Sequence, residues 1–329
     1  MNWHVAGYSL TIGSFILVTG RLGDMYGSKK MLVYGWIWFG LWSIVCGCSA
    51  LTGSAIFFDT SRALQGIGPA LMMPNAVAVA GRTYPPGMKK NIVFSLFASS
   101  APASCVISSL LGSTIAQWWW WPWSAWISGI GSFFLALLSY LVIPQGQCLA
   151  SSDKMAQFDW LGSVFGGGGL ILLNVSWNQA PIDGWSAPHV ILILVLGFLF
   201  LGTFTWHERR TAQPLLNMSI FNGRVTGILL TTALGWSSFG IWFYYMFQFI
   251  QQVRGASSLE SSLQFLPGAL SGMIAPLFTA WALDRWPTSW LVILASAAFF
   301  LGCLLQALAP VNQSYWFNTF WSFVITPWG

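Results

Sequence analysis

Few side chains in this sequence can carry a charge or move a proton, and most of them lie in short groups. The first group is the run Gly20-Arg21-Leu22-Gly23-Asp24-Met25-Tyr26-Gly27-Ser28-Lys29-Lys30, which places three basic residues around one carboxylate. The second is Arg62, with Asp59 three residues before it and Gln65 three residues after it, on one face of a helix. A carboxylate that pairs with a guanidinium when ionised, and releases it when protonated, can couple proton binding to a conformational change.

Composition places these groups in a membrane. The chain has 329 residues, of which 56% are hydrophobic, 17% aromatic and only 6% charged. Because a soluble domain carries about 25% charged residues, this chain cannot cover its surface with polar side chains. It is predicted to be an integral membrane protein. The same composition excludes disordered, collagen-like and nucleic-acid-binding proteins.

The gaps between charged residues predict the membrane spans, since each span needs roughly 20 apolar residues. We expect an all-α transmembrane bundle rather than a β-barrel, because the apolar runs far exceed the ~10 alternating residues of a barrel strand. Eleven spans are predicted, at about 3–20, 31–51, 59–82, 91–115, 123–143, 159–178, 188–206, 224–250, 260–283, 289–308 and 314–329.

The distribution of basic residues predicts the orientation of the spans. Eleven of the 13 Lys and Arg residues fall in alternate loops on one side, which we take as cytoplasmic: Arg21, Lys29, Lys30, Arg82, Lys89, Lys90, Lys154, Arg209, Arg210, Arg224 and Arg285. Arg254 falls on the other side and Arg62 inside a span. An arginine within a span costs at least ~2.5 kcal/mol to insert and therefore needs a partner or a water-filled cavity.

The run from Gly20 to Lys30 resembles the loop signature of the major facilitator superfamily, G-x-L-x-D-x-x-G-x-(K/R)-(K/R), at every fixed position. The resemblance implies that Asp24 and the basic residues Arg21, Lys29 and Lys30 form a gating charge network with neighbouring helix ends. The alternative is a tight cytoplasmic turn, in which Gly20, Gly23 and Gly27 supply positive φ angles.

Two further segments are similar to signatures of this family. The segment Arg62-Ala63-Leu64-Gln65-Gly66-Ile67-Gly68-Pro69-Ala70 looks like its fourth-helix signature, R-x-x-Q-G-x-G-x-A, which implies a role of Arg62 in proton coupling. The alternative is an arginine that snorkels toward the outer side and is held by Asp59. Ala98 to Cys105 resembles the antiporter signature G-x(3)-G-P-x(2)-G-G in part. Pro102 is kept, whereas Ala101 and Ser104 replace glycines, so a merely proline-kinked packing helix is the alternative.

A weak internal repeat is consistent with two related half bundles. Asp284 and Arg285 end a span on the cytoplasmic side, as Asp24 does, and are candidates for a second-half gate. Two extra spans between the halves resemble the fourteen-spanner drug:proton antiporter branch, as found in fungi. The predicted division is a first half bundle at 1–143, two linking helices with their loops at 144–222, and an incomplete second half at 223–329. The chain is expected to be truncated at both ends.

Candidate substrate contacts are aromatic and amide residues of the span after the linking helices, because aromatic rings with a few polar groups suit poorly soluble organic molecules. They are Trp236, Phe239, Trp242, Tyr245 and Gln248.

The expected function is export of small organic molecules by proton antiport through alternating access. Uptake of a nutrient or siderophore, and an inactive truncated fragment, are the alternatives. The expected partners are a small organic substrate, protons and the lipid bilayer, with no nucleic acid. We expect a monomer in the plasma membrane, with the vacuolar membrane as the alternative.

No enzyme activity or cofactor is expected. No metal is expected either, since His4, His189 and His207 are too few and too scattered to bind one.

Overall fold

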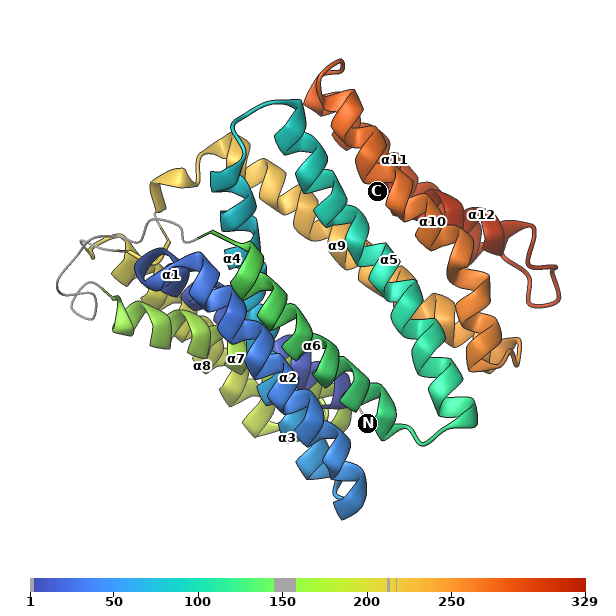
Figure 1. The fold of residues 1–329 in the computed structure, drawn as a ribbon, viewed down its shortest axis with the longest axis horizontal. Helices are drawn as coiled ribbons and strands as arrows, with labels where there is room; N and C mark the ends of the chain where they lie inside the picture. Colours follow the sequence, from blue (N-terminus) through green and yellow to red (C-terminus); the bar gives the residue numbers. More distant parts are fainter. Residues whose placement is uncertain (1–2, 145–157, 212–213, 217) are drawn as a thin grey trace. The chain divides into compact units, whose positions relative to one another are not determined.

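The computed structural model describes residues 3–144, 158–211, 214–216 and 218–329, and its secondary structure there is entirely helical (Figure 1). Lys154 lies outside the described residues. The predicted all-α class is confirmed. The α-helices are α1 (Trp3–Tyr26), α2 (Ser28–Thr52), α3 (Ala55–Gln65), α4 (Ile67–Thr83), α5 (Met88–Trp118), α6 (Pro122–Val142), α7 (Trp160–Asp183), α8 (Pro188–Glu208), α9 (Gly223–Gln248), α10 (Ser258–Leu283), α11 (Thr288–Ala307) and α12 (Asn318–Ile325).

Nine helical stretches of the described chain are long and apolar enough to cross a membrane. Two of them join elements: Ala55–Thr83 combines α3 with α4, and Gly223–Val253 combines α9 with the π-helix η2 (Phe249–Val253). The chain is therefore an integral, multi-pass membrane protein.

The nine stretches correspond to the second to tenth predicted spans, and α1, which covers the first, is not among them. The structure adds a helix break to one predicted span and shortens the helix of another. The third predicted span, 59–82, is two helices that meet at Gly66. The last predicted span, 314–329, holds only the eight residues of α12 and the 3₁₀-helix η3 (Thr326–Trp328). At 1.5 Å per residue, eight residues cover about 12 Å, well short of the ~30 Å of hydrocarbon.

The described helices pack into two compact units. The first comprises residues 1–82 and 121–220, and the second comprises 83–120 and 221–329. Packing thus groups α5 with the later helices, although the sequence repeat assigns it to the first half. The sequence division at 1–143, 144–222 and 223–329 describes repeats, and it stays a prediction.

Small residues bring α2 and α6 together in the first unit. A Cβ on Gly129 would lie 3.0 Å from the carbonyl oxygen of Gly40 and 2.9 Å from Ile44 Cγ1. A Cβ on Gly40 would in turn lie 3.1 Å from the carbonyl oxygen of Gly129. Two helices in an apolar solvent associate through such close packing, because lipid provides no hydrophobic force between them.

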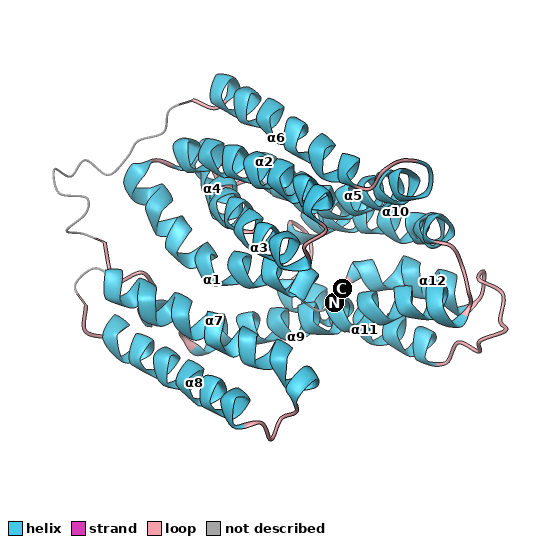
Figure 2. Ribbon diagram, turned by 90° about the horizontal axis from the view of Figure 1, so that it is seen from below, coloured by secondary structure: helices cyan, strands magenta, loops and turns pink. Residues whose placement is uncertain are grey.

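The linking helices α7 and α8 pack side by side by the same means (Figure 2). Three of the four glycines from Gly166 to Gly169 face bulky side chains of α8: a Cβ on Gly166 would lie 3.0 Å from Phe204, and one on Gly169 would lie 2.8 Å from Leu201. These glycines serve helix packing, as expected for a glycine run inside a span. α7 also packs against α1.

In the second unit, α5 runs along α10 (Figure 1), and α10 also contacts α12. Pro102 of α5 occupies the space beside Gly272 of α10, where an added Cβ would come within 3.1 Å of the proline ring. Ser99 Oγ donates a hydrogen bond of 2.8 Å to the carbonyl oxygen of Met273. The core of this unit is aromatic and aliphatic, and consists of Val106, Trp242, Met246, Ile250, Phe265, Ala269 and Phe323.

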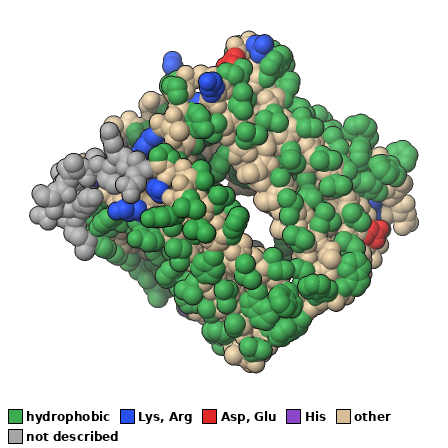
Figure 3. Space-filling model, in the orientation of Figure 1, with side chains coloured by type: hydrophobic (Ala, Val, Ile, Leu, Met, Phe, Trp, Pro, Cys, Tyr) green, Lys and Arg blue, Asp and Glu red, His purple; other side chains and the backbone are tan. Residues whose placement is uncertain are grey.

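On the face that Figure 3 shows, hydrophobic side chains cover most of the surface and charged side chains are few. Leucine, isoleucine, phenylalanine and tryptophan side chains of α6, α8 and α11 are among the exposed ones. This surface suits contact with lipid.

Replacement of Gly129 by valine is expected to destabilise the chain by about 1–3 kcal/mol, because the new side chain would overlap α2. Gly131→Val is the matched control on the same helix, since a Cβ there meets nothing within 4 Å. The measurement is the thermal unfolding midpoint of the purified chain in nanodiscs. Equal midpoints for the two variants would contradict the close α2–α6 contact.

Candidate functional site

The run Gly20 to Lys30 forms two helix ends joined by a single non-helical residue. Gly20 to Tyr26 complete α1, and Ser28 to Lys30 begin α2. Gly27 between them has φ = 102°, a conformation that favours glycine. A positive φ is therefore required at Gly27, whereas Gly20 and Gly23 are helical.

Asp24 pairs with an arginine from another helix end. Arg82, in the last turn of α4, donates from Nη2 to Asp24 Oδ1 at 2.6 Å and from Nη1 to Ser28 Oγ at 3.4 Å. The side chains of Arg82 and Asp24 are 54% and 44% exposed. The ion pair thus ties the α1–α2 junction to the end of α4, at a site that water can reach.

The structure shows no ion pair between Asp24 and Arg21, Lys29 or Lys30 among the described residues. Lys29 Nζ lies 5.1 Å from the centre of the Tyr140 ring, on α6. The sequence identified Arg82 only as one of the basic residues of the predicted cytoplasmic loops, not as a partner of Asp24. Its position at the end of α4 nevertheless fits the predicted network with neighbouring helix ends.

Gly23 allows α1 to approach α4 directly beside this pair. A Cβ on Gly23 would lie 1.7 Å from Asn75 Oδ1, a distance that real atoms do not adopt. Asn75 is buried, and its Nδ2 donates to the carbonyl oxygens of Leu71 at 2.8 Å and Thr19 at 3.3 Å. Any larger residue at position 23 would displace this asparagine.

Arg62 is held within a chain of polar groups, as the spacing of the second motif predicted in part. Its Nη1 donates to Gln65 Oε1, and Gln65 Nε2 donates to Ser43 Oγ of α2 at 2.5 Å. The guanidinium carbon also lies 4.6 Å from the centre of the Tyr8 ring of α1, a distance suited to a cation–π interaction. Asp59 lies one turn before Arg62 on α3 and is partly buried. Sequence reasoning did not find Tyr8 or Ser43, because neither carries a motif.

Side chains of α1 and α2 donate to backbone carbonyl groups beside the helix break at Gly66, in addition to the backbone N–H of Gly66. Thr11 Oγ1 of α1 donates to the carbonyl oxygen of Ala63 at 2.6 Å, and Trp38 Nε1 of α2 donates to that of Leu64 at 2.7 Å. Gly66 leaves room for this arrangement, since a Cβ there would lie 2.0 Å from Thr11 Oγ1. α1 and α2 thus fix the position of the turn that bears Arg62.

The fifth-helix motif lies in the middle of α5. Pro102 packs on Gly272, Ala101 and Ser104 are exposed, and Ser104 Oγ donates to the carbonyl oxygen of Ala101 at 2.9 Å. The proline therefore makes a close helix contact at this point. Its role in antiport stays a prediction.

Asp284 and Arg285 lie at the end of α10 but do not pair with each other. Asp284 Oδ1 accepts a hydrogen bond of 3.3 Å from Asn91 Nδ2, in the first turn of α5. Arg285 Nη1 donates to the carbonyl oxygen of Trp281 at 3.2 Å, and its guanidinium stacks 4.4 Å from the Trp281 ring centre. Beside Asn91 is a groove of about 460 Å³, whose lining includes the polar groups of Lys90, Ser95, Thr279 and Trp328.

The five predicted substrate contacts all lie on α9, and they differ in burial. Trp242 is 5% exposed, belongs to the core, and donates from Nε1 to Ser322 Oγ at 2.8 Å. Phe239 packs against the same core, whereas Trp236 and Tyr245 are 67% and 64% exposed. Gln248, partly buried, ends the helix. The structure thus places Trp242 and Phe239 in helix packing, and substrate contact by any of the five stays a prediction.

Among the described residues no cluster of His, Cys, Asp and Glu has the arrangement of a metal site.

Replacement of Gln65 by leucine is expected to destabilise the chain by about 1–3 kcal/mol, because Arg62 would lose its acceptor inside the bundle. Thr60→Val is the matched control, since Thr60 is exposed on the same helix. Urea or thermal unfolding of both variants in nanodiscs measures the difference. If Gln65→Leu were as stable as the parent chain, the polar chain through Arg62 would contribute nothing to the fold.

Comparison with known proteins agrees with this architecture. The whole chain, residues 1–329, matches the family described as Major Facilitator Superfamily. It is 50% identical over 329 residues to the major facilitator superfamily multidrug transporter mdr3 of Aspergillus fumigatus, covering all of this chain and 56% of that protein. It is 45% identical to the low affinity ammonium transporter of Saccharomyces cerevisiae, and 37% identical to the efflux pump terJ of Aspergillus terreus. All of this chain and 64% of each of those two proteins are covered.

The chain therefore spans between slightly more than half and just under two thirds of the length of these relatives. The match covers every described helix, including those that carry Asp24 and Arg62. The chain belongs to the major facilitator superfamily of membrane transporters.

Proposed function

We propose that this chain takes part in the export of small organic molecules in exchange for protons. The observation that carries the proposal is the position of Arg62: a guanidinium inside a membrane-spanning stretch, held by Gln65 and Tyr8, with the carboxylate of Asp59 one turn away. Arginine and carboxylate groups within a span are costly and are kept where they bind substrates or ions.

The coupling would arise because a proton and the guanidinium of Arg62 compete for the carboxylate of Asp59. Ionised Asp59 attracts the guanidinium of Arg62 across one helical turn, whereas protonated Asp59 does not. Gln65 and Tyr8 can hold Arg62 in both cases, since an amide oxygen and an aromatic face accept a cation without ionising. Proton binding would then shift the balance of conformations without leaving the guanidinium unpaired.

The Asp24–Arg82 pair would act as a switch between conformations. Both side chains are about half exposed, so the pair is worth no more than about 1 kcal/mol and can open at little cost. It joins the α1–α2 junction to the end of α4, and Gly23 keeps these helices close. An interaction of this strength can bias two states without preventing their exchange.

Contacts between α5 and α10 would change in the transport cycle, because the sequence assigns these helices to different halves. The Asn91–Asp284 hydrogen bond lies at the predicted cytoplasmic end of this helix pair, and the Pro102–Gly272 contact lies in its middle. The first would open with the cytoplasmic side, whereas the second would act as the pivot.

The organic cargo is supported by the names of two relatives, a multidrug transporter and an efflux pump. The exposed aromatic side chains Trp236 and Tyr245 offer apolar contact area with a polar edge, which suits such molecules. The name of a third relative concerns ammonium, so a small cation is the second cargo class to be measured.

Replacement of Arg62 by alanine is expected to lower protonophore-sensitive efflux by at least about tenfold, because the lost charge-assisted hydrogen bond is worth about 1.5–3 kcal/mol. The measurement is export of a panel of fluorescent drugs from cells that express the chain, with and without protonophore. Arg210→Ala is the control, since Arg210 stacks on Trp206 outside the motif.

Three outcomes separate the possibilities. Protonophore-sensitive export that only Arg62→Ala abolishes supports the proposal. Accumulation of drugs or methylammonium would indicate uptake instead. If the chain is inserted in the membrane and moves no cargo of either class, the proposed activity is wrong for this chain.

Replacement of Asp24 by asparagine is expected to leave membrane insertion and thermal stability nearly unchanged but to reduce transport several-fold, because the switch loses its ion pair. The exchanged pair Asp24→Arg with Arg82→Asp should recover part of the activity that either single change removes. Surface amount and efflux rate are measured together. Normal transport by Asp24→Asn would contradict the gating role.

A further inference from the structure

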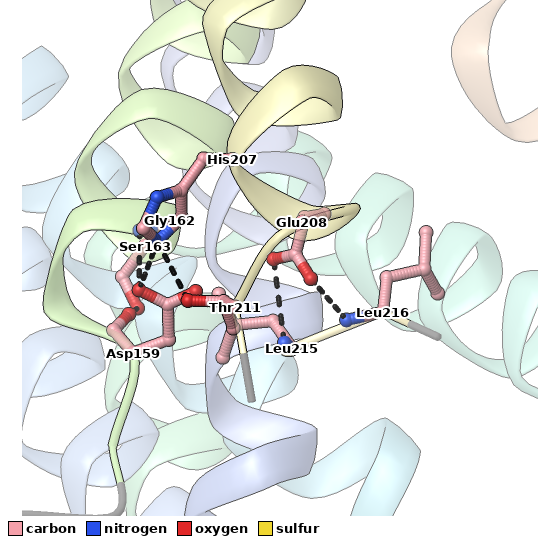
Figure 4. Close-up of polar contacts among 8 residues, drawn as sticks. All are labelled: Asp159, Gly162, Ser163, His207, Glu208, Thr211, Leu215 and Leu216. Carbon is pink, nitrogen blue, oxygen red and sulfur yellow. Dashed lines mark hydrogen bonds and ion pairs between the residues drawn. The ribbon is translucent and has the colours of Figure 1, made fainter. Parts of the chain in front are cut away.

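Three titratable side chains gather where the linking helices begin and end on the predicted cytoplasmic side (Figure 4). Asp159 caps the first turn of α7, and His207 and Glu208 are the last two residues of α8. None of them belongs to the motifs assigned to gating or proton coupling. They lie in the first unit, in the part of the chain that joins the two predicted halves.

The side chains of these three residues are mostly buried. The side chains of Asp159 and His207 are 7% and 21% exposed, and Glu208 is 3% exposed. Asp159 Oδ1 accepts hydrogen bonds from the backbone N–H of Gly162 at 2.8 Å and contacts His207 Nε2 at 2.9 Å. Its other oxygen, Oδ2, is buried and has no hydrogen-bond partner among the described residues.

Glu208 faces the same small space. A Cβ on Gly162 would lie 2.5 Å from Asp159 Oδ2 and 2.9 Å from Glu208 Oε1, so the absence of a side chain at Gly162 leaves room for both carboxylates. Glu208 also accepts hydrogen bonds from the backbone N–H groups of Leu215 at 3.3 Å and Leu216 at 3.2 Å (Figure 4). It thereby fixes the described part of the connection between α8 and α9.

Few other charges face the cluster from the elements packed around it. The α1 residues Ser14, Leu17 and Val18, which line a cavity of about 130 Å³ beside Gly162, are uncharged. Arg21 lies one helical turn beyond Leu17 on α1 and is the nearest charged residue of that face by register. On α8 and after it, Arg210 stacks on Trp206 and Arg209 is exposed. Asp153 and Lys154 lie outside the described residues.

The charges of the cluster do not balance without a proton. Two ionised carboxylates in one buried space would repel each other and lose their hydration, and one histidine side chain could carry at most one compensating charge. A single proton between the two carboxyl groups removes the second charge and supplies Asp159 Oδ2 with the hydrogen bond that it lacks. We propose that Asp159 and Glu208 bind one proton between them, and so form a proton-binding site on the linking helices that is separate from the Arg62 group.

The bound proton would secure the connection to α9. With the proton in place, Glu208 can face Asp159 and still accept from Leu215 and Leu216. When the proton passes to water, repulsion separates the carboxylates and weakens this anchor. The site takes up a proton as pH falls and releases it as pH rises, so its stabilising effect is complete at low pH and is lost toward high pH.

The same two helices provide a matched control at their other end. Asp183 Oδ2, at the end of α7, contacts His189 Nε2 of α8 at 2.8 Å, with side chains 32% and 54% exposed. The described structure shows an aspartate–histidine pair there as well, but in solvent and without a second buried carboxylate. Loss of the Asp183 carboxylate should therefore release no shared proton.

The test is infrared spectroscopy of the purified chain in nanodiscs near neutral pH, with the C=O stretching band of protonated carboxyl groups as the readout. Wild type should show such a band, which disappears on alkaline titration. Glu208→Gln and Asp159→Asn should each lose its pH-dependent part, and Asp183→Asn should keep it. Thermal unfolding gives a second readout: the unfolding constant of wild type should rise by up to about tenfold per pH unit over the range in which the site releases its proton. This rise should be flatter in Glu208→Gln.

Several results would overturn the proposal. One is a band and a pH profile in Glu208→Gln that match those of wild type. Another is stabilisation by Na⁺ or K⁺ at fixed pH that Glu208→Gln abolishes, since this would assign the site to a metal cation. Should both carboxylate variants fail to fold, the wild-type chain still decides, because the absence of any protonated carboxyl near neutral pH contradicts a bound proton. None of these readouts depends on transport, so the proposed antiport can fail independently.

Discussion

A polar group inside an apolar bundle must find its partner within the protein, and the first unit is arranged around this requirement at Arg62. The guanidinium occupies a helix that is broken one turn later, at Gly66, so a charge and the carbonyl groups beside the break lie together inside the bundle. Gln65 and Tyr8 hold the charge, and Thr11 and Trp38 hold the carbonyls. Most of these partners come from α1 and α2. The interactions made by this one turn of α3 therefore hold α1, α2 and α3 together.

Close packing makes those short contacts possible. Glycine at the α1–α4, α2–α6 and α7–α8 contacts lets neighbouring backbones or bulky side chains enter space that any larger residue would fill. Hydroxyl groups then reach carbonyl oxygens across helices, as Thr19 does to Ala70 at 2.5 Å. Such hydrogen bonds hold helices together in lipid, where burial of apolar surface cannot. A glycine contact and a hydrogen bond from a hydroxyl to a carbonyl oxygen also join α5 to α10 in the second unit.

Polar groups at the helix ends have a different physical role. The half-exposed Asp24–Arg82 pair is screened by water and costs little to break, which suits an element that must alternate between states. The buried Asp159, His207 and Glu208 cannot separate so cheaply, because each charge left without a partner would stay desolvated. Under the proposals made above, the first unit combines a weak switch with a more firmly held anchor.

The sequence predicted the helical fold, and nine of its eleven spans coincide with helical stretches long and apolar enough to cross a membrane, because apolar runs of fixed length can only be helices in lipid. It also predicted the Arg62–Gln65 contact, since three residues bring side chains onto one face of a single helix. It did not predict the break at Gly66 or the shortness of α12, because hydropathy says nothing of backbone breaks inside an apolar run.

Contacts between helices were decided by the tertiary structure. Arg82 rather than Arg21 pairs with Asp24, Tyr8 and Ser43 complete the Arg62 group, and Trp242 packs into a core. These residues lie far apart along the chain, and their types carry no spacing that would reveal their meeting. By itself the sequence determined which segments are helices and which charges must find partners. Only the packing of those helices decided which partners they are, because the rotation of each helix sets which side chains face each other.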